Sequence, residues 1–206
     1  MITNEIAKDL TVVRESIVTL SDKFKSNADI FLNESDLQSE LFTLLLSAYG
    51  EKVAIQNISV WGTNAPKKTK AVYTRRLHSE LCVPEGQIDL AILDLEHVRL
   101  AINSKYHFGH IQLEDGNHIF IEIKCSRTNR SSITSRNRWV GLIRKDVNKL
   151  CRYSHPCFLV CFDFSFGLDN KTIAKLQKSC SPNLELFYYT SAEADNYLAG
   201  TLRQQG

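Results

Sequence analysis

Two stretches of alternating apolar and polar residues could supply the side chains for phosphodiester hydrolysis. In one of them, residues 118–124, Glu122 and Lys124 lie two positions apart among isoleucine and phenylalanine residues. Side chains two apart on a strand share a face, and a glutamate and a lysine would be costly to bury in so apolar a strand without partners. In the other, residues 87–92, Asp89 lies between Ile and Leu residues. If the two strands pair with their polar faces aligned, Asp89, Glu122 and Lys124 converge.

Such a convergence would suit the cleavage of a phosphodiester bond. The reaction needs a positioned metal ion, an activated water and a cation that offsets charge growing on the phosphate. Hard cations such as Mg²⁺ prefer carboxylate oxygens and keep several waters. Two simpler interpretations stay open: Glu122 and Lys124 could form a surface ion pair on an edge strand, and Asp89 could be a turn residue at the end of a strand.

An aspartate on one strand followed by Glu-x-Lys on the next resembles the signature of the PD-(D/E)XK, or restriction-endonuclease-like, nucleases. Here Asp89 and Glu122-Ile123-Lys124 match it, with 32 residues between the two acids, and Ile88 stands where the signature has proline. The resemblance covers roughly residues 33–164. It implies a core of one helix, three strands, a helix and a strand (αβββαβ), for which the matching segments are 35–49, 53–60, 87–92, 118–124, 138–153 and 158–164.

The resemblance also implies roles for individual residues. Asp89, Glu122 and the backbone carbonyl of Ile123 would bind Mg²⁺ or Mn²⁺, and Lys124 would orient or deprotonate the attacking water and stabilise charge on the phosphate. Many members add an acid from the first core helix, and Glu40 borders the apolar stripe of the helix expected here. Glu40 could also be a plain surface acid, with Asp36 or Glu34 in its place. Gln87 could hydrogen-bond to one of the metal ligands or touch the phosphate.

Basic charge is concentrated in one segment. From Lys124 to Arg152 there are nine Lys and Arg residues and one acid, Asp146, whereas the rest of the chain holds 16 basic and 22 acidic residues. This distribution favours a polyanionic partner, most simply DNA, although a solvated basic helix face would look the same. By the same resemblance, the residues expected to contact the nucleic-acid backbone are Arg136, Arg138, Arg144, Lys145 and Lys149.

The remaining patterns predict an α/β fold with a central mixed sheet flanked by helices. Apolar residues at helical spacing indicate a helix over 5–26, and Asn33 or Ser35 could cap the second helix. Residues 158–164 read as a strand buried on both faces. Further elements are expected as extended residues over 71–83, a strand or hairpin around Val98–Ile102, a helix near 169–179, a strand at 184–189 and a helix from Ser191 onward. We expect a single nuclease-like domain, 1–206, with an N-terminal helix (1–30), the core (33–164) and a C-terminal α/β extension (165–206).

Composition narrows the class of protein. The six cysteines form no close CxxC pair, so they are expected to be reduced and mostly buried. The histidines at 107, 110 and 118 do not favour a zinc site, because nothing in the sequence orders the loop that carries two of them. The N-terminus does not resemble a signal peptide, and we expect a cytoplasmic protein.

Together these patterns predict a metal-dependent nuclease, most simply a DNA endonuclease. A homodimer or a larger nuclease complex would suit the cutting of both strands of a duplex, but the sequence itself shows neither. One alternative is a catalytically inactive nucleic-acid-binding or protein-interaction module of the same fold. Another is an unrelated α/β protein whose basic helix binds an acidic partner.

Overall fold

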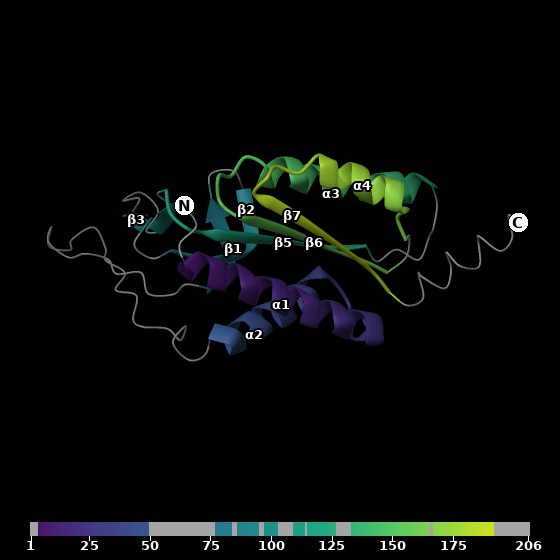
Figure 1. Ribbon diagram of the computed structural model, residues 1–206, viewed down its shortest axis with the longest axis horizontal. Helices are drawn as coiled ribbons and strands as arrows, with labels where there is room; N and C mark the ends of the chain where they lie inside the picture. The colour runs from purple at the N-terminus through teal and green to yellow at the C-terminus, as the bar shows by residue number, and fades with distance from the viewer. Residues whose placement is uncertain are drawn as a thin grey trace, which may run out of the picture.

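Five strands form a mixed sheet that is flanked by helices on both faces. The computed structural model describes residues 4–49, 77–83, 86–94, 97–102, 109–113, 115–126, 133–164 and 167–191. In this part of the chain, helices α1 (Asn4–Ser26) and α2 (Glu34–Tyr49) lie against one face of the sheet, and α3 (Ile133–Leu150) and α4 (Asn170–Lys178) lie against the other (Figure 1). The predicted α/β class with a central mixed sheet is therefore confirmed.

The first face is covered by α1 (Asn4–Ser26), a short 3₁₀ helix η1 (Ala28–Ile30) and α2 (Glu34–Tyr49). The predicted apolar stripe of α1 is buried throughout, because residues three and four apart share one side of a helix. Asn33 caps α2 as predicted: its Oδ1 accepts from the Asp36 backbone N–H, while Asp36 accepts from the backbone N–H groups of Leu32 and Asn33. This reciprocal capping fixes where α2 begins, and so places Glu34 in its first turn.

The sheet has the strand order β1-β2-β5-β6-β7. Strand β2 runs antiparallel to both of its neighbours, β1 and β5, whereas β5, β6 and β7 are parallel to one another. The bounds of the five strands are β1 Leu77–Val83, β2 Gly86–Ile92, β5 Ile119–Ser126, β6 Cys157–Asp163 and β7 Leu184–Thr190. Strand β6 is buried along its whole length, as its apolar run predicted.

The second face is covered by α3 (Ile133–Leu150) and α4 (Asn170–Lys178). The hairpin predicted near 98–102 is present as β3 (Val98–Ile102) paired with β4 (Gly109–Leu113), and it forms a separate two-stranded sheet. Residues 77–83, expected only to be extended, supply the strand next to β2. The strand predicted at 53–60 and the helix predicted after Ser191 lie outside the described residues.

The pairing of β1 with β2 is interrupted at Glu80 and Asp89. The ladder includes the residues on either side but not this pair, and Glu80 has a φ of 55°. A side chain in this left-handed region costs about 1 kcal/mol or more. Across the break, Ile88 packs in the core under α3 and α4, whereas Leu90 packs in the core under α1 and α2. The alternation expected over 87–92 would place Ile88 and Leu90 on one face, and in this respect it is wrong.

None of the helices in the described ranges combines the length and the apolar character that crossing a membrane requires.

Candidate active site

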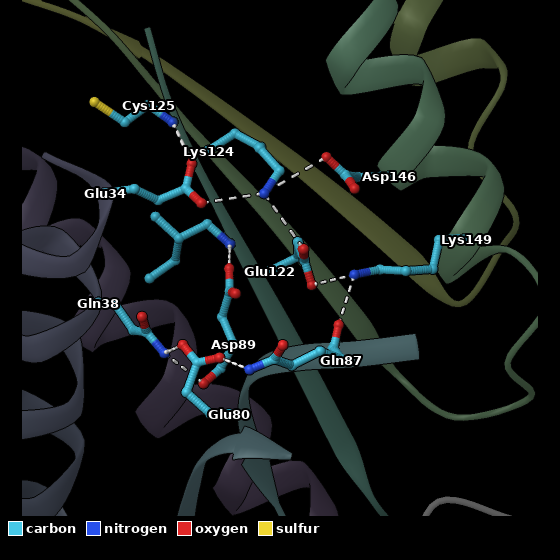
Figure 2. A network of polar contacts seen from close by, with 11 residues as sticks. Glu34, Gln38, Glu80, Gln87, Asp89, Glu122, Lys124, Cys125, Asp146 and Lys149 are labelled. Atoms are coloured by element: carbon cyan, nitrogen blue, oxygen red, sulfur yellow. Dashed lines mark hydrogen bonds and ion pairs between the residues drawn. The ribbon is translucent and has the colours of Figure 1, made fainter. Parts of the chain in front are cut away.

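Asp89 and Glu122 lie beside each other where β2 and β5 separate (Figure 2). The antiparallel pairing ends at Leu90 and Ile121, and the next positions in the same register are Asp89 and Glu122. The Asp89 carboxylate continues the contact between the strands, because its Oδ2 accepts from the Ile123 backbone N–H at 2.7 Å. The convergence of these two acids, expected from sequence, is thus present in the structure.

Lys124 lies among carboxylates contributed by three elements. Its Nζ is 3.4 Å from Glu122 Oε1, 3.2 Å from Glu34 Oε1 and 3.8 Å from Asp146 Oδ2. Glu34 also accepts from the Cys125 backbone N–H at 3.1 Å, so the start of α2 is tied to the end of β5. The ammonium is therefore held in place from β5 itself, from α2 and from α3.

A second lysine, Lys149 on α3, approaches Glu122 from the opposite side. Its Nζ is 2.7 Å from Glu122 Oε2 and donates to the Gln87 carbonyl at 2.8 Å. The Glu122 side chain is only 5% exposed, so its charge requires counter-charges of this kind. The contact with Oε2 is a close ion pair rather than a well-aligned hydrogen bond. We call these residues the carboxylate–lysine cluster, namely Glu34, Asp89, Glu122, Lys124, Asp146 and Lys149.

Burial and neighbouring charges shift the proton equilibria in the cluster. Burial, reinforced by the Glu122 carboxylate, raises the pKa of Asp89 to about 7, against the opposing effects of the Ile123 N–H and Lys124. Burial also raises the pKa of Asp146, although Lys124 opposes it. For Lys124, burial would lower the pKa, but the surrounding carboxylates outweigh it and raise the pKa above its ordinary value. Lys124 is therefore a persistent cation at neutral pH.

The charge balance of the cluster fits a divalent cation. Counted as ionised, its four carboxylates and two ammonium groups leave a formal charge of −2. The repulsion between Asp89 and Glu122, which contributes to the raised pKa of Asp89, would be relieved by a cation between them. Within the described ranges, no three Asp, Glu, His or Cys side chains form a metal site by themselves. The pair suits an ion such as Mg²⁺, which is bound through one or two carboxylates and keeps several waters.

Glu40, the acid expected from the first core helix, is not part of the cluster. It forms an ion pair with Lys23 of α1, where both side chains are substantially exposed. Glu34, which sequence reasoning offered only as a substitute, takes the position beside Lys124 instead. Glu34 rather than Glu40 lies beside Lys124 because the first turn of α2, and not its middle, reaches the end of β5.

Two further polar residues around Asp89, Gln38 and Glu80, were not identified from sequence. Gln38, one helical turn after Glu34, donates from Nε2 to the Asp89 carbonyl at 2.9 Å and to Glu80 Oε1 at 2.7 Å. Glu80 also accepts from the side chain of Gln87. Gln38 and Glu80 line a groove of about 350 Å³ between α2 and β1. The i, i+4 spacing of Glu34 and Gln38 was an available signal for a shared polar helix face.

Asp146 is the member of the carboxylate–lysine cluster that was not proposed as a site residue from the sequence. It is the one acid in the basic segment, and it is buried on α3 beside Lys124. A lone acid among nine basic residues is a signal that could have identified it. It also shows that α3 presents charge toward the sheet as well as toward solvent.

The five basic residues expected to contact nucleic acid divide into two groups. Arg138, Arg144 and Lys145 are exposed on α3. Arg136 forms an ion pair with Asp169 at 3.1 Å, and Lys149 is turned into the cluster, with a side chain only 18% exposed. Lys149 therefore lies apart from the exposed basic residues of α3 in this structure, because its long side chain reaches back to a buried carboxylate.

Comparisons of this chain with protein-family models, with curated proteins and with solved structures find no match.

Proposed function

We propose that this chain is a metal-dependent nuclease that hydrolyses phosphodiester bonds in DNA. The observation that carries the proposal is the meeting of Asp89 and Glu122 from neighbouring strands with the ammonium of Lys124 beside them. Three side chains of these types where two neighbouring strands separate are the minimal protein contribution to metal-assisted phosphate chemistry.

The order of elements supports a restriction-endonuclease-like core. Helix α2, strands β1, β2 and β5, helix α3 and strand β6 follow one another as the resemblance implies, with the β3–β4 hairpin inserted before β5. The first three of these strands are antiparallel, and the fourth is parallel to the third. On this reading β1, rather than a strand at 53–60, is the first strand of the core.

The cluster suggests a division of labour among the chain's own residues. Asp89, Glu122 and the carbonyl of Ile123 would hold Mg²⁺ or Mn²⁺, which would polarise the scissile phosphate and make a bound water more acidic. Glu34 and Asp146 hold the Lys124 ammonium in place. Lys124, a cation beside Glu122, would stabilise negative charge on the phosphate and orient the attacking water.

Binding of the substrate would rely on the exposed face of α3. Arg138, Arg144 and Lys145 project from this helix. Contacts from such residues to the phosphate backbone are salt-dependent and carry no sequence information. DNA would thus be held over the helix that also contributes Asp146 and Lys149 to the cluster.

The test is cleavage of supercoiled plasmid and of single-stranded DNA in Mg²⁺, Mn²⁺ or EDTA. Wild type should cut in metal and not in EDTA, whereas Glu122→Gln and Lys124→Met should lose at least about 100-fold in rate. Glu185→Gln and Lys175→Met are matched controls on β7 and α4, and they should cut like wild type.

Cleavage by Glu122→Gln at the wild-type rate would overturn the proposal, as would cleavage that persists in EDTA. DNA binding without cleavage in either metal would instead favour a non-catalytic nucleic-acid-binding module.

A further inference from the structure

Lys149 occupies an unusual position for a residue of a basic helix face. Its ammonium lies 2.7 Å from a carboxylate that is 5% exposed, and it is also hydrogen-bonded to the Gln87 carbonyl. We infer that Lys149 is a built-in counterion, which neutralises Glu122 in the metal-free protein and has to leave it when a divalent cation binds. The inference rests on the proposed metal-dependent function and adds a positioning residue to it.

The geometry makes Lys149 and a metal ion competitors for the same oxygen. An ion held between Asp89 and Glu122 needs a carboxylate oxygen of Glu122. Each of the two Glu122 oxygens already has an ammonium group beside it. Lys124 is the looser neighbour, at 3.4 Å from Oε1, whereas Lys149 is at 2.7 Å from Oε2. A cation that takes Oε2 must therefore displace Lys149 or suffer direct repulsion from it.

The two lysines differ in what would hold them afterwards. Lys124 also contacts Glu34 and Asp146, so it keeps these two carboxylates as counter-charges if Glu122 binds a metal ion. Among the described residues, Lys149 forms a close ion pair with Glu122 alone, and its second contact is a neutral carbonyl. Asp146 attracts it only from beyond ion-pair distance. Lys149 is therefore the lysine that moves, and its release would present a cation to an incoming phosphate oxygen.

The inference can be tested without nucleic acid and without turnover. Mn²⁺ binding to the full chain is measured by titration calorimetry for wild type, Lys149→Met and Lys149→Gln. Lys149→Gln keeps a donor for the Gln87 carbonyl while it removes the charge. Lys175→Met is the control for a lost exposed lysine, and circular dichroism establishes that each variant is folded.

If Lys149 competes with the metal, both Lys149 variants bind Mn²⁺ about tenfold more tightly than wild type, because a like charge has been removed beside the ion. Lys175→Met should stay within about twofold of wild type, since its charge is distant and screened. Unchanged or weaker binding by folded Lys149→Gln would overturn the inference while leaving the metal site intact. Absence of Mn²⁺ binding in wild type and in both Lys149 variants would overturn the proposed function as well.

Discussion

Replacing Asp89 by asparagine should stabilise the metal-free protein, and the gain should depend on pH. The change keeps an oxygen to accept from the Ile123 N–H and removes the charge that burial and Glu122 disfavour. An aspartate has a pKa of about 3.9 when unfolded, and in the folded protein that of Asp89 is raised to about 7. Below about pH 4 Asp89 is protonated in both the folded and the unfolded protein, so its raised pKa does not affect stability. As the pH rises from about 4 to about 7, the unfolded protein loses this proton more readily than the folded one, and the free energy of unfolding falls.

The size of the effect follows from the two pKa values. At about 1.4 kcal/mol per tenfold change in the proton equilibrium, the full difference corresponds to about 4 kcal/mol above pH 7. This figure is an upper bound, because water and ion pairs rearrange around the charge, and we expect a gain of about 2 kcal/mol at pH 8.

Urea unfolding in EDTA between pH 5 and pH 8 measures this gain for Asp89→Asn. The exposed carboxylate of Glu185, which pairs with Arg14, provides the control: Glu185→Gln should change stability by less than about 1 kcal/mol at every pH. The reasoning fails if Asp89→Asn is less stable than wild type at pH 8, or if its advantage is the same at pH 5 and pH 8.

Two further predictions concern the helices on either side of the sheet. Glu34→Gln should slow DNA cleavage about 10- to 100-fold, because Lys124 loses an anchor, whereas Glu40→Gln should stay within about twofold; equal rates for the two variants would contradict the assignment of Glu34. Arg144→Gln combined with Lys145→Gln should make log Kobs for DNA less dependent on log salt concentration, by a slope of about 1.8, in fluorescence anisotropy titrations; an unchanged slope would exclude both residues from the interface.

The core of the site could be predicted from sequence because it depends on strand periodicity. Glu122 and Lys124 interrupt an apolar strand at a spacing of two, and Asp89 is a single acid between apolar residues of the strand that pairs with it. Burying such residues without partners costs free energy, so an arrangement in which they contact one another was expected.

The choice of helix acid could not be predicted in the same way. A helical wheel gives the angle of Glu40 around α2, but not how far along the sheet it lies. Glu34 and Glu40 are six residues apart, which is about 9 Å along the axis. Only the crossing of α2 over the strands decides which of them reaches Lys124.

Two other features depend on tertiary structure. The positive φ of Glu80, and with it the face change between Ile88 and Leu90, has no sequence signal, because glycine is the residue that usually marks such a conformation. The inward turn of Lys149 depends on the flexible stem of lysine, which lets one residue belong to a basic surface by pattern and to a buried ion pair by structure.

Anomalous diffraction from crystals soaked in Mn²⁺ would test the central claim most directly, because it locates the metal ion itself. We predict a peak within about 2.5 Å of carboxylate oxygens of both Asp89 and Glu122, with Lys149 moved away from Glu122. A well-ordered site with no manganese between these two carboxylates, and Lys149 still paired with Glu122, would contradict the account.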